Sequence, residues 1–126
     1  MSGVTYDAGA LIAAEQGSRS MWTLHRRLLE RGVRPTLSTV VLGQVWRGGP
    51  QVKLSRLLGG CRIAPLSESE ARYAGAALAA SRTDDVIDAA VVVTALARKD
   101  LVVTSDPDDL RRIASAVGRS IALHVV

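Results

Sequence analysis

The 126-residue chain has no phenylalanine and only two tryptophans and two tyrosines, so its core must consist mainly of aliphatic and small side chains. Its one cysteine, Cys61, excludes a disulfide within the chain and fits a reducing compartment such as the cytoplasm. No apolar run reaches the roughly 18 residues of a membrane span. The first residues show no basic segment followed by an apolar one. We therefore expect a cytoplasmic protein without a membrane span or secretory signal.

The chain also lacks the patterns of several common enzyme classes. Neither GxGxxG nor GxxxxGK[ST] occurs, and the glycine-containing segment GGPQVKLSRLLGG follows no expected strand, which argues against a nucleotide-cofactor enzyme. His25 and His124 are isolated and have no partner at a spacing typical of metal or nucleophilic sites. The net charge of +4 is compatible with a polyanionic partner but is too small to identify one.

Short strand-like and helix-like segments alternate along the sequence. Strands are expected at 4–6, 34–38, 61–64, 101–104 and 121–126, and helices at 8–14, 20–31, 39–46, 52–58, 71–80, 85–96 and 107–117. Ser67 and Glu70 form a capping box before the fifth helix. Strands that alternate with helices predict an α/β three-layer fold, a short and mostly parallel central sheet flanked by helices. The length fits a single domain over residues 1–126.

Aspartates lie at the ends of the expected elements. Asp7 follows the first strand and Asp106 follows the fourth, while Asp85 and Asp88 share one face at the start of a helix. In a parallel sheet, sites form beyond the carboxyl ends of the strands, so these acids should converge there, with Asp100 at the opposite edge. Carboxylates that close together either raise each other's pKa or need a divalent cation, and Mg²⁺ or Mn²⁺ suits such a cluster. Such a site predicts phosphodiester cleavage by a metal-activated water.

At these residues the chain resembles the PIN-domain ribonucleases, particularly the VapC-type toxins of bacterial toxin–antitoxin pairs. The resemblance rests on Tyr6-Asp7 with 8–13, on Asp88-Ala89-Ala90 with 91–95, and on Val102 to Asp106 continuing to Asp109-Leu110. It covers nearly the whole chain in order. It implies a PIN-like fold, a four-acid Mg²⁺ or Mn²⁺ site, RNA cleavage, homodimerisation and inhibition by a cognate antitoxin.

The resemblance assigns the acids by position. Asp7, Asp88 and Asp106 match the first, third and fourth acids and form the expected metal-binding and catalytic core. The second acid, normally a glutamate, falls at Gln44, which is a departure from the family pattern. Supplementary metal ligands are expected among three residues: Asp85, Asp109 and Gln44.

Each assignment has a structural alternative. Asp7 is also a good helix cap, and the acids at 106, 108 and 109 suit the positive end of a helix. Thr104 or Ser105 either hydrogen-bonds a metal ligand or a metal-bound water, or only terminates the strand. The basic helix face formed by Arg26, Arg27 and Arg31 is either a contact for RNA or antitoxin or a solvated surface.

Arg47, beside Trp46, is a candidate contact for the substrate or a partner, whereas Trp46 and Trp22 are expected in the core. We expect a metal-dependent endoribonuclease that cleaves RNA as the toxin of a toxin–antitoxin pair. The alternative is a PIN-like module that binds RNA or protein with weakened catalysis, which Gln44 favours.

Overall fold

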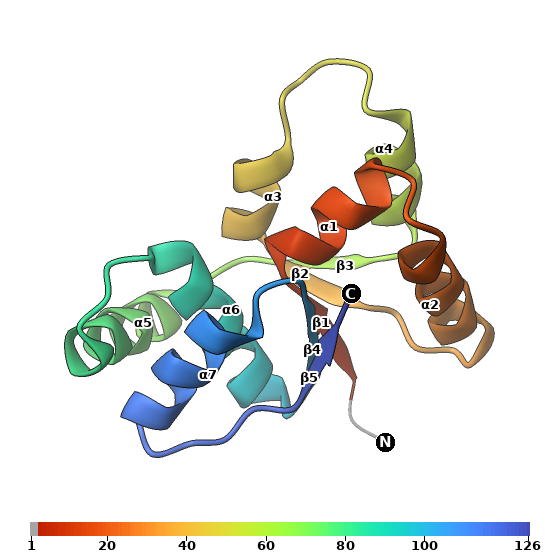
Figure 1. Ribbon diagram of the computed structural model, residues 1–126. Helices are drawn as coiled ribbons and strands as arrows, with labels where there is room; N and C mark the ends of the chain where they lie inside the picture. The colour runs from red at the N-terminus through yellow and green to blue at the C-terminus, as the bar shows by residue number, and fades with distance from the viewer. Residues whose placement is uncertain (1–2) are drawn as a thin grey trace.

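A parallel five-stranded sheet organises the molecule (Figure 1). The structure, a computed structural model, describes residues 3–126. Its strands have the order β3-β2-β1-β4-β5. Their bounds are β1 Val4–Tyr6, β2 Thr36–Ser38, β3 Arg62–Ala64, β4 Leu101–Thr104 and β5 Leu123–Val125. All pairings are parallel, with Thr5 opposite Thr36 on one side and Val102 on the other.

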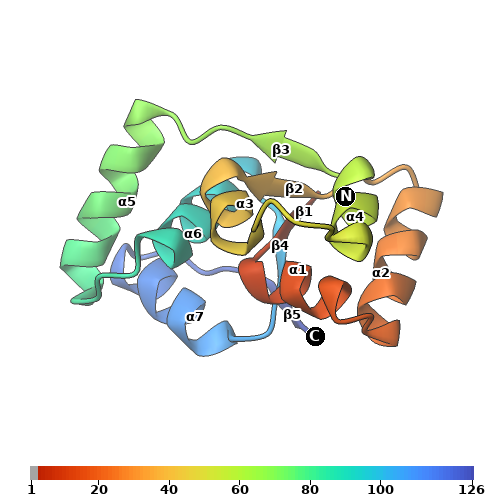
Figure 2. The ribbon, with the colours of Figure 1, turned by 90° about the horizontal axis from the view of Figure 1, so that it is seen from above.

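Helices cover the sheet on both sides (Figures 1 and 2). Their bounds are α1 Ala8–Glu15, α2 Arg19–Glu30, α3 Thr39–Val45, α4 Val52–Gly59, α5 Glu68–Ser81, α6 Val86–Arg98 and α7 Pro107–Ala116. Helix α1 packs against α2, α3 and α4, while α5, α6 and α7 pack against one another; α3 also contacts α6. The predicted α/β three-layer fold is confirmed. No helix of residues 3–126 has both the length and the apolar character that crossing a membrane requires.

Local capping fixes the starts of several helices, including α5, which begins three residues before the predicted start at 71. The side chains of Asp7, Ser38 and Asp85 accept hydrogen bonds from backbone amides at the starts of α1, α3 and α6. Ser67 and Glu70 form both bonds of the capping box at α5. The core is mainly aliphatic, as expected, and its largest fully buried side chains are Tyr6, Leu11, Met21, Leu37, Leu54, Leu57, Leu110 and Ile113.

The two tryptophans differ in their burial. Trp22 is half-buried, packs against the core and donates its Nε1 hydrogen to the carbonyl of Ala14 at 2.9 Å. The prediction that Trp46 belongs to the core is wrong, because its side chain is 42% exposed. Helix α3 ends at Val45, and Trp46 takes extended backbone angles (φ −74°, ψ 134°), so its side chain leaves the helix face that the sequence pattern assigned to it.

Candidate metal centre

Asp7 lies at the carboxyl end of β1 and is 5% exposed. Its backbone amide continues the sheet by donating to the carbonyl of Val103. One carboxylate oxygen accepts the amide of Ala8 at 2.6 Å, and the other accepts the hydroxyl of Thr104 at 2.7 Å. Burial raises the pKa of Asp7, the two hydrogen bonds oppose that shift, and the charge of Asp85 adds to it. Asp7 is therefore both a helix cap and a buried carboxylate with an acidic neighbour.

Asp85 and Asp88 stand at the start of α6. Asp85 is exposed, and its Oδ1 accepts the backbone amides of Ile87 and Asp88, both at 3.0 Å. Asp88 lies half-buried in the first turn. Burial, followed by the charges of four other aspartates, raises the pKa of Asp88 to about 7; these are Asp85, Asp7, Asp109 and Asp106 in order of effect.

Asp106 begins α7 but does not cap it. Its side chain accepts no capping hydrogen bond, so its carboxylate is not used to start the helix. The charge of Asp109 is the main cause of the raised pKa of Asp106, with smaller effects from Asp108 and Asp7. Asp108 lies in the first turn of α7, and its carboxylate is 3.6 Å from Arg111 on the surface.

The starts of α1, α6 and α7 therefore bring five aspartates near one another at the carboxyl edge of the sheet. The effect of all four others on Asp88 is the observation that joins them. Asp100 lies outside this group at the opposite edge, where it accepts the hydroxyl of Thr5 at 2.9 Å. The sequence predicted this division from the order of strands and acids alone.

Thr104 connects two of the acidic segments. Its fully buried hydroxyl donates to the carboxylate of Asp7 and accepts the backbone amide of Asp106 at 3.0 Å. Ser105 is exposed and lies against α1: a Cβ added to Gly9 would collide with its Oγ and lie 2.9 Å from its backbone nitrogen. Gly9 and Thr104 thus allow the starts of α1 and α7 to approach closely.

The donor set fits a hard divalent cation. It consists of carboxylate oxygens, and the charges of neighbouring aspartates contribute, after burial, to the raised pKa of Asp88. Among residues 3–126, no three Asp, Glu, His or Cys side chains lie close enough to bind one metal ion in their present positions. Metal binding would require the carboxylates to draw together.

Neither Gln44 nor Arg47 forms a side-chain hydrogen bond or ion pair with these aspartates among residues 3–126. Gln44 is exposed on α3 and forms no side-chain hydrogen bond with an aspartate in the part of the chain that the structure describes. Arg47 is exposed on the α3–α4 loop, where its backbone amide donates to Oε1 of Gln51 at 2.8 Å. Gln44 therefore stays a predicted supplementary ligand, carried by a helix that packs against α1 and α6.

A buried pair that the sequence analysis missed connects β1 with α2. The hydroxyl of Tyr6 and Nδ1 of His25 are 2.8 Å apart, and the rings of His25 and Trp22 meet edge to face. Burial lowers the pKa of His25. No spacing rule identifies this pair, because its members lie 19 residues apart on different elements.

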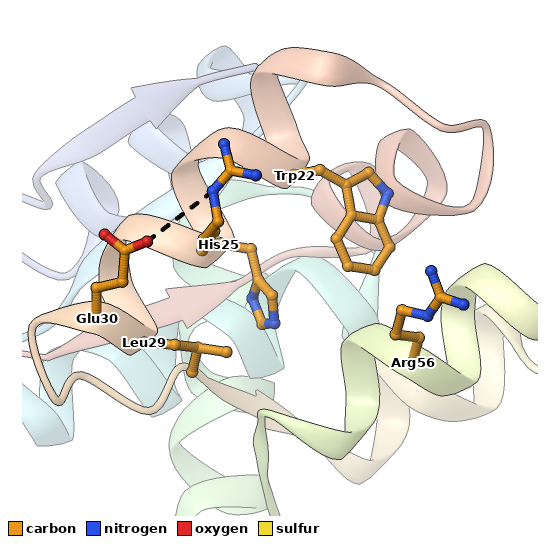
Figure 3. Close-up of a pocket in the computed structure, with 6 residues that line it drawn as sticks. Trp22, His25, Leu29, Glu30 and Arg56 are labelled. Carbon is orange, nitrogen blue, oxygen red and sulfur yellow. Dashed lines mark ion pairs between the residues drawn. The ribbon is translucent and has the colours of Figure 1, made fainter.

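His25 also forms part of a cavity of about 460 Å³ lined by residues of α2 and α4, none of which is an aspartate (Figure 3). Its lining residues are Trp22, His25, Arg26, Leu29, Glu30 and Arg56. Arg26 and Glu30 form an exposed ion pair at 4.0 Å on its rim. Glu30 is the one carboxylate among these lining residues, so the cavity is not the candidate metal site.

Solved structures resemble the chain along most of its length. A chain of VapBC2 from Rickettsia felis, bound to a DNA fragment from their promoter, matches with a TM-score of 0.75 and 18% identity, covering 98% of both chains. DNA-bound VapBC from Salmonella typhimurium gives 0.72 and 17%, covering 99% of this chain and 98% of the other. A toxin–antitoxin complex from Klebsiella pneumoniae gives 0.67 and 20%, covering 85% and 89%. The chain shares the fold of these toxin–antitoxin proteins.

This similarity confirms the VapC-like fold that the sequence resemblance implied. No protein-family model and no curated protein sequence matches the chain. At these low identities the similarity establishes the fold, and the activity has to be argued from the chemistry of the site.

Proposed function

We propose that the chain is a Mg²⁺- or Mn²⁺-dependent endoribonuclease and the toxin of a toxin–antitoxin pair. The observation that carries this proposal is the position of Asp7, Asp88 and Asp106 at the starts of α1, α6 and α7, where the Thr104 hydroxyl bonds both the Asp7 carboxylate and the Asp106 amide. The raised pKa of Asp88 supports it. A bound cation would relieve the repulsion that the neighbouring aspartates exert on Asp88. The fold shared with toxin–antitoxin proteins supports the biological role.

Asp7, Asp88 and Asp106 would hold the ion, with Asp85 and Asp109 as supplementary ligands. A bound Mg²⁺ or Mn²⁺ would polarise a phosphate and lower the pKa of an attacking water. The protein's own contribution is placement. Thr104 holds the carboxylate of Asp7 and the backbone of Asp106 with a single hydroxyl, which limits their separation before the ion arrives.

Protonation of Asp88 would govern when the ion can bind. A carboxylate ligand must be deprotonated, and the pKa of Asp88 lies at about 7. We therefore expect metal affinity to rise with pH up to about 7 and to level off above it. The pKa of Asp7 is also raised, mainly by burial, and that of Asp106 mainly by the charge of Asp109, so these carboxylates should favour metal binding at higher pH as well.

The proposed partner is an antitoxin protein. An acidic antitoxin segment should bind the basic chain, and an arginine from it would pair with the aspartates. Because exposed charges are screened by salt, the complex should weaken as salt rises. Co-purification with the product of the neighbouring reading frame, and growth arrest on expression without it, test the toxin role. We also propose that the protein forms a homodimer and is cytoplasmic. Size-exclusion chromatography with light scattering tests the dimer.

Cleavage of single-stranded RNA by the purified protein tests the enzyme. We expect cleavage with Mg²⁺ or Mn²⁺, none in EDTA, and none for Asp106→Asn in either condition. Asp100→Asn, a change of the same kind at the other edge of the sheet, should still cleave. Cleavage by Asp106→Asn at the wild-type rate would contradict the assignment, because a nuclease contaminant would then explain the activity.

One alternative has an observation in its favour. Gln44 occupies the position of the usual second acid and forms no hydrogen bond with the aspartates among residues 3–126. A PIN-like module that binds RNA or protein with weakened catalysis would bind single-stranded RNA without cutting it at any Mg²⁺ or Mn²⁺ concentration. The same RNA assay, with binding measured alongside cleavage, separates the two functions.

A further inference from the structure

The loop that joins α3 to α4 is held in place by one side chain. Gln51 accepts the backbone amide of Arg47 at 2.8 Å, and its Nε2 donates to the carbonyl of Val45 at 3.1 Å and to a carboxylate oxygen of Glu15 at 2.6 Å. Gln51 therefore connects both ends of the loop to each other and to the end of α1. We call residues 46–51 the Gln51-bound loop.

The Gln51-bound loop presents an aromatic ring and a cation to solvent. Trp46 is 42% exposed. The guanidinium of Arg47 donates one hydrogen bond, from Nη1 to the carbonyl of Trp46 at 2.8 Å, and has no acidic partner within residues 3–126. Gly48 has φ +78°, a conformation that favours glycine, and lets the chain turn after Arg47. An exposed ring and an unpaired guanidinium are thus held on an ordered loop.

The position of the loop relates it to the acidic edge. Helix α3 starts after Ser38, at the carboxyl end of β2, the edge where Asp7 follows β1. A helix of 7 residues is roughly 10 Å long, so the loop begins about that far along α3 from the edge. Figure 1 shows the loop, drawn in yellow, extending above this end of the sheet. The loop therefore follows a helix that starts at the same edge of the sheet as the aspartates.

The negative charge of the aspartates makes RNA binding depend on contacts elsewhere on the surface. Five aspartates repel RNA phosphates at long range, so affinity for RNA has to come from groups outside the site. Aromatic rings that stack on unpaired bases and arginines that bind phosphates are the groups that single-strand binding proteins use. Trp46 and Arg47 supply one of each, side by side.

We propose that the Gln51-bound loop is a binding surface for single-stranded RNA, on which Trp46 stacks against an unpaired base and Arg47 binds a neighbouring phosphate. The inference rests on the proposed RNA substrate for its choice of nucleic acid. It extends that proposal by favouring unpaired over duplex RNA, since a paired base cannot present its face to an indole ring.

Binding of a labelled single-stranded RNA to the Asp106→Asn protein with Mg²⁺ tests the surface. In that background, Trp46→Leu should weaken binding at least fivefold, the lower end of the known effect of losing one stacked base, and Trp46→Phe should restore part of it. Arg47→Gln should weaken binding and reduce the salt dependence by about one phosphate contact. The matched controls are Tyr73→Leu, which removes a ring that is 38% exposed on α5, and Arg98→Gln at the far end of α6. Both should bind as the parent does.

Tryptophan fluorescence gives a direct second readout. A base stacked on Trp46 should quench its emission as single-stranded RNA is added, whereas duplex RNA of the same sequence should quench much less. Replacing Trp46 by Phe should remove most of the quenching, because the remaining tryptophan, Trp22, is half-buried against α1. Quenching that persists in Trp46→Phe would contradict stacking at this ring.

The outcomes separate this inference from the proposed function. If the wild type cleaves RNA and Trp46→Leu binds RNA like the parent, the loop surface is wrong and the nuclease stands. If nothing is cleaved but binding depends on Trp46, the surface stands and the catalytic proposal fails. If Trp46→Leu leaves RNA binding unchanged but alters the oligomeric state or antitoxin binding, the loop is a protein contact and the inference is overturned.

Discussion

Two buried aspartates at opposite edges of the same sheet show what distinguishes the candidate site. Asp7, at the carboxyl end of β1, accepts the hydroxyl of Thr104 at 2.7 Å. Asp100, just before β4, accepts the hydroxyl of Thr5 at 2.9 Å. They are 5% and 9% exposed. Burial and threonine bonding are therefore nearly the same, and neither marks a site.

The difference lies in the neighbours. Asp7 lies near Asp85 and raises the pKa of Asp88, whereas Asp100 follows the turn that ends α6, where its backbone amide donates to the carbonyl of Ala95. The backbone amide of Asp100 closes the turn after α6, and its carboxylate accepts the hydroxyl of Thr5 in the neighbouring strand β1. The carboxylate of Asp7 likewise caps α1 and accepts the hydroxyl of Thr104, but Asp7 is also one of several neighbouring carboxylates. The gathering of charge, and not the buried carboxylate itself, indicates metal chemistry.

The largest expected effect is the loss of RNA cleavage when the Asp88 carboxylate is neutralised at the carboxyl edge. Neutralising Asp100 at the opposite edge is the matched comparison. Asp88→Asn should reduce metal-dependent RNA cleavage on the order of 100-fold or more, since even the loss of a group behind a metal ligand costs about 10- to 100-fold. Asp100→Asn should cleave near the wild-type rate and lose about 1 kcal/mol of stability, because its hydrogen bond from Thr5 is no longer charge-assisted. Initial cleavage rates and urea unfolding measure the two effects. Equal loss of cleavage in both variants would remove the distinction between the edges.

Thr104 and Thr5, which donate to Asp7 and Asp100, allow a sharper comparison of the two edges. Thr104→Val and Thr5→Val each leave a buried aspartate without its hydroxyl donor, and each should cost about 1–3 kcal/mol in the free energy of unfolding. Only Thr104→Val should also weaken metal affinity, because it releases the carboxylate of Asp7 and the amide of Asp106. Serine at position 104 should restore both properties. If Thr5→Val weakened metal binding equally, Thr104 would have no positioning role.

Most of the fold was predictable because its signals are local. The capping box at Ser67 and the cap at Asp85 act within a few residues, and the strands stand between clear turns. The convergence of the acids followed from the parallel topology. The burial of Trp46 was not predictable, because it depended on whether α3 ended one residue earlier or later. The pairs Thr104–Asp7 and Tyr6–His25 were not predictable either, since they join side chains from separate elements.

The difference in unfolding free energy between Asp88→Asn and the wild type should depend on pH through the titration of Asp88. Its pKa in the folded chain is about 7, above the ordinary 3.8, so the folded state holds the proton more tightly. The resulting stability is fully present below about pH 4 and is lost as pH rises through about 7. Above pH 7 without metal, Asp88→Asn should be more stable than wild type by about 1–2 kcal/mol, a full shift discounted for half-exposure. Urea unfolding in EDTA at pH 4.5 and 8 measures the gap; a gap independent of pH would contradict the cause.

The smallest effect concerns the departure at Gln44. If its side chain faces a bound ion, Gln44→Glu adds one unit of attraction and should tighten Mn²⁺ binding by roughly tenfold. If Asp85 already supplies that charge, Gln44→Glu should change little and Asp85→Asn should cost most of the affinity. Metal titration of both variants decides between them. Unchanged affinity in both would place Gln44 and Asp85 outside the metal site.

Calorimetric titration of Mn²⁺ into metal-free protein at pH 8 tests the central claim most directly, since it requires neither RNA nor an antitoxin. We expect saturable binding to the wild type, near-wild-type binding to Asp100→Asn, and little or none to Asp88→Asn. Binding that is absent from the wild type, or that survives unchanged in Asp88→Asn, would contradict a metal site at the carboxyl edge of the sheet.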